Sequence, residues 1–166
     1  VAEKLKIPRV VFPIAAGVYS ALGLLASPLS FELSRSRRII ADDIDATTFA
    51  SFFEPLIKET KKSLKEAGVN DGEVRISRQI EARYFGQTHE IEVTLPENNL
   101  NEVFDNLRRL FETRYAEVYS FAVIDAPIEI INWKVLASGP EPEFDTGYAL
   151  SSREQRETTK PQKGTR

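Results

Sequence analysis

The sequence predicts an α+β domain of the ferredoxin-like type, in which two helices cover one face of a four-stranded antiparallel sheet. Three patterns point to this class. A hairpin of two alternating runs lies in the middle of the chain, an amphipathic helical pattern lies on each side of it, and a β-type run stands at both ends of the series. From residue 30 onward the predicted order is therefore β-α-β-β-α-β, preceded by an extra βα unit.

The first strand of this series is predicted over residues 30–40. Its run FELSRSRRII is strand-like but polar in the middle, which indicates an edge strand or an exposed face. Three acidic residues follow it and supply N-cap candidates together with favourable charge at a helix start. These are Asp42, Asp43 and Asp45.

The first helix of the domain is predicted over about residues 46–67. Apolar residues recur along it at spacings of three and four, which places them on one buried stripe. Pro55 interrupts the pattern and should either kink the helix or begin a second one, and Gly68 is suited to end it. The stripe consists of Phe49, Phe52, Phe53, Leu56, Ile57 and Leu64.

The central hairpin reads RYFGQTHEIEVTLP over residues 83–96, with a Gly-Gln turn between two strands. Apolar and polar residues alternate on both sides of the turn, as in half-buried strands, until Pro96 closes the second run. The apolar phase comprises Val74, Ile76, Ile80, Ala82 and Tyr84 before the turn and Ile91, Val93 and Leu95 after it. An ordinary hairpin without chemistry also explains this pattern.

The second helix is predicted from Asn99, which with Glu102 resembles a reciprocal capping box, through Tyr115. Its apolar stripe is Leu100, Val103, Phe104, Leu107, Leu110, Phe111 and Tyr115. The last strand, residues 128–137, is predicted to place Ile131, Trp133, Val135 and Ala137 on one face.

Composition excludes several classes of function. The 166 residues carry a formal net charge of −3 and a pI near 5.4, so the chain has no electrostatic footprint for nucleic acid. Cysteine is absent, which excludes disulfides, thiolate catalysis and cysteine-rich zinc sites. We expect a cytoplasmic location, which this composition permits.

The run from Val10 to Ser30 contains no charged residue and has the length of a membrane span. Proline and glycine divide it into a short strand, Arg9 to Phe12, and a helix over about Val18 to Ser27. Neither piece is long enough to cross about 30 Å of hydrocarbon, so no membrane insertion is expected.

Candidate chemistry within the chain is sparse. His89, the only histidine, falls on the apolar phase of the second hairpin strand, where packing or capping is expected rather than catalysis. Glu90 and Glu92 share a face with Glu81 and Arg83, and a cross-strand ion pair is expected unless the carboxylates line a pocket. Gly17 stands between strand and helix but lacks the lysine or further glycine of a phosphate-binding loop.

Three segments resemble, in order, the C-terminal part of the hydantoinase A and oxoprolinase family, which includes N-methylhydantoinase subunits, 5-oxoprolinase and an acetone carboxylase subunit. They are IPRVVFPIAAGVYSALGLLAS at residues 7–27, RYFGQTHEIEVTLP at 83–96 and APIEIINWKVLASG at 126–139. The chain departs from the family pattern at three positions. Ala16 replaces a usual proline, and Arg114 and Ser120 stand where histidine and glycine are common.

The resemblance implies an ATP-dependent parent enzyme that opens cyclic amides or carboxylates related small carbonyl compounds, with ATP and a divalent metal bound upstream of Val1. Residues 1–27 would then be a βα remnant of the actin-like nucleotide-binding domain. Residues 28–139 would be the ferredoxin-like domain, and residues 140–166 would be a polar flexible tail. The chain would be cut at both ends. Positions near the nucleotide would be Gly17, Ser20, Ala21 and Gly23. The signature hairpin residues are Arg83, Tyr84, Gly86, Gln87 and Glu90.

We therefore expect an accessory, structural domain that is inactive alone. It is expected to have no catalytic or metal-binding residues and no cofactor of its own. Its expected partners are the upstream domains and a second hydantoinase-type subunit. An alternative is a regulatory module, since ferredoxin-like folds often hold metabolites between paired subunits. A weaker alternative, an acyl phosphate hydrolase, would need an anion-binding loop after the first strand, where this chain is acidic.

Overall fold

The computed structural model describes residues 1–12, 16–97, 99–121, 123 and 125–142. The chain divides into two compact units. One unit is Pro28–Glu141, and the other contains Val1–Ser27. Most of the predicted flexible tail, from residue 143 onward, lies outside the described residues.

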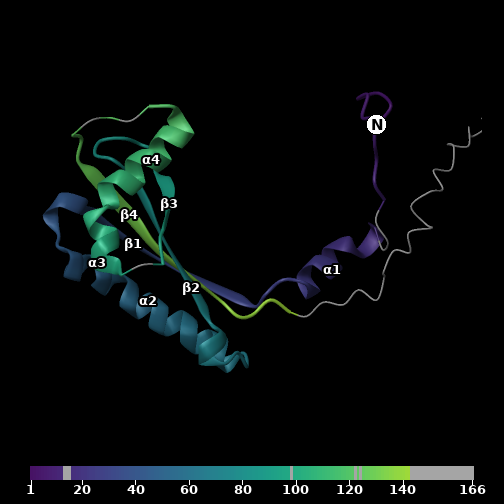
Figure 1. Ribbon diagram of the computed structural model, residues 1–166, viewed down its shortest axis with the longest axis horizontal. Helices are drawn as coiled ribbons and strands as arrows, with labels where there is room; N and C mark the ends of the chain where they lie inside the picture. Colours follow the sequence, from purple (N-terminus) through teal and green to yellow (C-terminus); the bar gives the residue numbers. More distant parts are fainter. Residues whose placement is uncertain (13–15, 98, 122, 124, 143–166) are drawn as a thin grey trace, which may run out of the picture. The chain divides into compact units, whose positions relative to one another are not determined.

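A four-stranded antiparallel sheet forms the framework of the unit Pro28–Glu141 (Figure 1). Its strands are β1 (Ser30–Ile40), β2 (Arg75–Tyr84), β3 (Ile91–Leu95) and β4 (Ile128–Ser138), and they lie in the order β1-β4-β2-β3. The predicted α+β class and the antiparallel four-stranded sheet are confirmed. The strand order is a variant of the ferredoxin-like one, whose central strands are the first and third, whereas β4 and β2 are central here.

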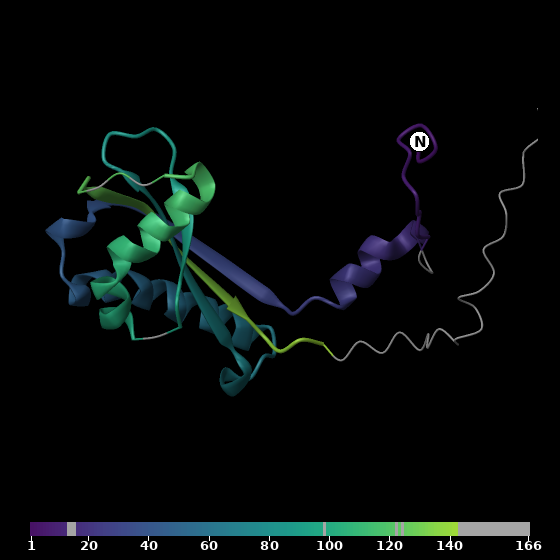
Figure 2. The same cartoon turned by 45° about the horizontal axis from the view of Figure 1, so that its top comes forward.

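The helices of this unit lie on one face of the sheet (Figure 2). They are α2 (Ala46–Glu66), α3 (Leu100–Asp105) and α4 (Leu107–Tyr119). The core between the layers is rich in aromatic residues because both predicted helical stripes point inward. Its large, fully buried side chains include Phe49, Phe53, Phe111 and Trp133.

Helix α2 begins and ends as its sequence predicts. The Asp45 carboxylate accepts a hydrogen bond from the Thr48 amide at 2.7 Å, which makes it the N-cap. After the helix, Gly68 has φ of 92° and Val69 donates to the Leu64 carbonyl, the pattern of a Schellman C-cap. The helix runs through Pro55, so no second helix begins there.

The second predicted helix is divided at Asn106. Its Nδ2 donates to the Glu102 carbonyl at 2.9 Å, and its backbone amide donates to the Val103 carbonyl instead. A short polar side chain competes in this way with the helical ladder, and α3 and α4 are the result. Asn99 is the N-cap of α3 as predicted, but its side chain accepts from the Asn101 amide at 2.9 Å and not from Glu102 as in a reciprocal box.

A β-bulge at Ile131 changes the phase of β4. Asn132 is opposite Glu81 and Ile130 is opposite Ala82, so Ile131 is an extra residue. The core face therefore holds Ile128 and Ile130 before the bulge and Trp133, Val135 and Ala137 after it. The prediction that Ile131 shares the face of Trp133 is wrong, because strict alternation cannot anticipate a bulge.

The unit that contains Val1–Ser27 has one α-helix in its described part, α1 (Tyr19–Leu25), preceded by a 3-10 turn at Ala16–Val18. Residues 9–12 belong to no strand, so only the helical half of the predicted βα unit is present. A strand needs a hydrogen-bonding partner, and the described residues of this unit offer none. In the part of the chain that the structure describes, no helix has the length and apolarity to span a membrane.

Candidate functional site

Three segments meet at one end of the sheet, which we call the hairpin end: the β2–β3 turn (residues 85–90), the last turns of α4 and the α4–β4 connection (Figures 1 and 2). Hydrogen bonds tie them together. Phe85 N donates to the Pro127 carbonyl at 2.8 Å, and the Gln87 side chain donates to the Tyr115 hydroxyl at 2.8 Å. The signature hairpin is therefore fastened to the helix layer at this end.

The hairpin turn is longer than its sequence suggests. Gln87 N donates to the Tyr84 carbonyl at 3.0 Å, and Gly86 takes φ of 87°, a turn position that favours glycine. The chain then continues as a loop, and β3 begins only at Ile91. His89 and Glu90 are exposed in that loop, so their predicted places on the strand are wrong, as is the predicted packing of His89.

Arg83 forms an ion-pair cluster with a buried carboxylate. Its Nε and Nη2 both lie 2.8 Å from Glu129 Oε2, and Arg38 Nε lies 3.3 Å from the other carboxylate oxygen. The side chain of Glu129 is 4% exposed, that of Arg83 14% and that of Arg38 67%. Arg83 also donates to the Thr88 carbonyl at 3.4 Å, so the cluster joins three strands to the hairpin loop.

Tyr84 is the aromatic centre of the hairpin end. Its ring packs edge-on against Phe111 and Tyr115, with ring centroids 4.9 and 4.8 Å away. Its hydroxyl accepts a hydrogen bond from the Val123 amide at 3.0 Å. Burial raises the pKa of Tyr84, so the group stays a neutral phenol that anchors the α4–β4 connection.

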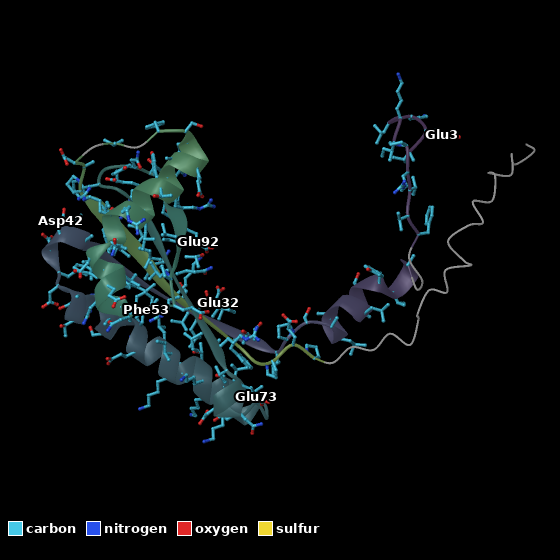
Figure 3. All side chains as sticks on the ribbon, viewed as in Figure 1. Glu3, Glu32, Asp42, Phe53, Glu73 and Glu92 are labelled. Atoms are coloured by element: carbon cyan, nitrogen blue, oxygen red, sulfur yellow. The ribbon has the colours of Figure 1, made fainter. Side chains whose placement is uncertain are left out.

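The face of the sheet opposite the helices carries a polar network that crosses all four strands. Ser36 donates to Asn132 at 2.5 Å, Asn132 donates to Glu81, and Lys134 pairs with Glu81 and with Glu92 at 3.1 Å. The hydrogen bond from Lys134 lowers the pKa of Glu81 and raises that of Lys134. Figure 3 shows Glu92 on this face and Phe53 on the opposite, helix-covered side. A cross-strand ion pair is present as predicted, but its cation is Lys134 and not Arg83, which pairs with Glu129 instead.

The four positions expected near nucleotide lie in the unit of Val1–Ser27. Gly17 is in the 3-10 turn, and Ser20, Ala21 and Gly23 belong to α1. All four are exposed, and a Cβ at Gly17 or Gly23 would meet no atom within 4 Å. They can offer backbone amides and one hydroxyl at close range, but no charged side chain.

The described surface of Pro28–Glu141 has shallow hollows. One of about 350 Å³ lies beside α3 and the start of β4, where Arg108 pairs with Asp42 at 3.3 Å. Within the described residues, no three histidine or carboxylate side chains come together as a possible metal site. The best-organised constellation of polar and aromatic groups is therefore the hairpin end.

A comparison with known protein families finds a match that includes the signature hairpin. The model of the hydantoinase/oxoprolinase C-terminal domain matches residues 41–127, just over half of the chain. The chain belongs to the hydantoinase/oxoprolinase family. The resemblance to this family is thereby confirmed, and the matched range contains the whole hairpin and both helix patterns.

Two relatives extend the match beyond that range. An uncharacterised protein of Methanocaldococcus jannaschii is 32% identical over 139 residues, which cover 83% of this chain and 19% of that protein. The caprolactamase subunit alpha of Pseudomonas jessenii is 25% identical over 154 residues, which cover 87% of this chain and 22% of that subunit. This hydantoinase/oxoprolinase domain thus spans about a fifth of the length of these relatives.

Solved structures share the fold. The ATP-dependent caprolactamase from Pseudomonas jessenii matches with a TM-score of 0.67 at 24% identity, over 81% of this chain and 21% of that one. Nucleotide-free acetone carboxylase, which carries out ATP-dependent acetone carboxylation, matches with a TM-score of 0.66 at 22% identity, over 76% and 19%. Both likenesses show the hydantoinase-type α+β fold.

Glu129 of β4 is a partner of the signature hairpin that the sequence pattern does not reveal. It pairs with the signature residue Arg83, yet it stands in the strand run IEIINW, in which apolar residues dominate the pattern. A signal was available, because a carboxylate inside an apolar strand is rarely buried without a partner. Arg83 was the nearby candidate on a predicted neighbouring strand.

Ser120 explains one departure from the family pattern. It caps α4 with φ of 65°, a left-handed conformation that glycine adopts without strain. Ser120→Gly is therefore expected to raise the free energy of unfolding by about 1 kcal/mol. Urea denaturation of the two proteins measures the change. Ser120→Ala, which keeps the Cβ, should bring no such gain, and equal effects of both substitutions would contradict the explanation.

Proposed function

We propose that this chain is an accessory, non-catalytic C-terminal domain of an ATP-dependent enzyme that opens cyclic amides or carries out a related carboxylation. The parent enzyme would bind ATP and a divalent metal through other domains, in the cytoplasm. The family assignment supports this reading, and so do the activities named for its relatives, a caprolactamase and an acetone carboxylase. The proposed role is to hold the domains and a second subunit of the parent in place.

The observation that carries this proposal is that side chains of the signature hairpin form contacts inside the domain. Arg83 is paired with the buried Glu129, the Tyr84 hydroxyl accepts from the Val123 amide, and the Gln87 side chain donates to Tyr115. Each of these functional groups takes part in a contact inside the domain. A hairpin kept for catalysis would instead direct such groups toward a substrate cavity.

The proposal also assigns the segment before Pro28 to the nucleotide-binding region. Its small residues Gly17, Ser20, Ala21 and Gly23 would let a nucleotide approach the backbone closely. They fit a neighbour of the nucleotide rather than its binding site, because they bring no cation for phosphate and no carboxylate for a metal. Those groups would come from the rest of the parent.

The isolated 166-residue chain is expected to hydrolyse no ATP, alone or with hydantoin, 5-oxoproline or caprolactam, because the side chains of Arg83, Tyr84 and Gln87 are committed to internal contacts. Phosphate release measured on the purified chain checks this, with the full-length parent as the positive control. Robust turnover by the isolated chain would refute the accessory role. Saturable thermal stabilisation by an amino acid or a nucleotide would favour the regulatory module instead.

A further inference from the structure

Five exposed apolar side chains lie at the hairpin end. Two of them pack against the buried Tyr115, whose ring centroid lies 4.6 Å from that of Tyr119 and 5.8 Å from that of Phe121. We call this surface the aromatic patch. Its members, with exposed fractions, are Phe85 at 64%, Phe121 at 55%, Val118 at 45%, Tyr119 at 40% and Val123 at 37%.

The backbone that presents this patch is held in a costly conformation. Ser120 has φ of 65° and Asp125 has φ of 58°, so two non-glycine residues of the α4–β4 connection are left-handed. Between these two residues in the chain, the Val123 amide donates a hydrogen bond to the Tyr84 hydroxyl. Strained residues of this kind concentrate at functional surfaces, where the surrounding structure maintains them.

The open face of the sheet differs from the patch. Its central charges, Glu81, Lys134 and Glu92, are paired with each other across the strands. Charged groups that already pair with each other do not require a protein partner. Clustered exposed aromatic residues, in contrast, are typical of the centre of a protein interface. Between the two surfaces, the aromatic patch is the one suited to burial.

We propose that the aromatic patch docks against the remaining polypeptide of the parent enzyme, through an apolar surface on that neighbour. The inference rests on the proposed function, since it takes this chain as one domain of a longer protein. The relatives are about five times as long as the part this chain matches. A neighbour in the same chain has a high effective concentration, which favours it over a separate subunit as the occupant.

Hydrogen–deuterium exchange tests the proposal by comparing the full-length parent with the 166-residue chain, whose unit Pro28–Glu141 has its own core. Amides between Val118 and Phe121 should exchange at least ~10-fold more slowly in the parent. Phe121→Ser should remove this protection. The matched control is Phe31→Ser, at an exposed aromatic opposite Ala137 at the other end of the sheet, which should leave the protection in place.

Equal exchange in the two proteins would overturn the proposal, and so would protection that appears only after a second subunit is added. Protection confined to the open face around Glu81 would overturn it as well. The readout does not depend on activity. A parent without ATP-dependent turnover would contradict the proposed function. The exchange result would still test the docking surface on its own.

Discussion

Trp133→Ala is expected to lower the free energy of unfolding by roughly 3–5 kcal/mol, the largest effect of any single substitution considered for this domain. The indole is 1% exposed and packs against three phenylalanine rings of α2. Their centroids lie 4.6 Å away for Phe52, 5.2 Å for Phe49 and 5.3 Å for Phe53. Alanine would leave a cavity between β4 and α2 that rigid neighbouring strands cannot close.

The measurement is urea denaturation followed by circular dichroism, with Trp133→Phe as the control. Phenylalanine keeps a ring in the core but loses the hydrogen bond from Nε1 to the Arg37 carbonyl at 3.1 Å. A loss of about 1–2 kcal/mol is therefore expected for the control. Should Trp133→Ala prove no more harmful than Trp133→Phe, the central place of this ring in the core would be wrong.

Arg83→Met is expected to destabilise the domain by about 3 kcal/mol, because it removes the main partner of a buried carboxylate. Glu129 would keep only Arg38, whose contact of 3.3 Å comes from a side chain that is 67% exposed. Arg38→Met should cost less than about 1 kcal/mol, as expected of a solvent-screened pair. Equilibrium unfolding of the two variants gives the comparison.

The double variant Arg83→Met, Glu129→Met separates the ion pair from simple packing. With both charges gone, no carboxylate is left buried without its partner, so most of the stability should return. The loss in the double variant should therefore be smaller than in Arg83→Met alone. Additive losses would mean that Arg83 acts through its contacts with the hairpin loop rather than through Glu129.

Periodicity predicted the parts of the fold in which a local pattern and the tertiary structure agree. The stripe of α2 points into the core, and the alternation before the turn buries Ile80, Ala82 and Tyr84. Gly68 and Asp45 end and begin α2 because their cap chemistry is local to the chain. Such features need no knowledge of distant residues.

The features that the sequence did not reveal depend on residues far apart in the chain. The bulge at Ile131 exists only relative to partner strands, and Glu129 is recognisable as half of a cluster only once β4 lies beside β2. His89 was misplaced because the length of the hairpin loop is set by contacts with Pro127 and Tyr115. The motif marks the signature hairpin in the sequence, but the internal contacts of its side chains depend on these distant partners.

Because β4 is a central strand, the sheet cannot be completed on the ribosome before β4 has been synthesised. β1 pairs with β4 alone, and Ser30 and Ser138, which face each other, are separated by most of the unit. Before β4 is synthesised, β1 has no strand to pair with and β2 can form only its hairpin with β3. The nascent chain therefore exposes unpaired backbone until β4 has been synthesised, and association with other chains competes with folding during that time.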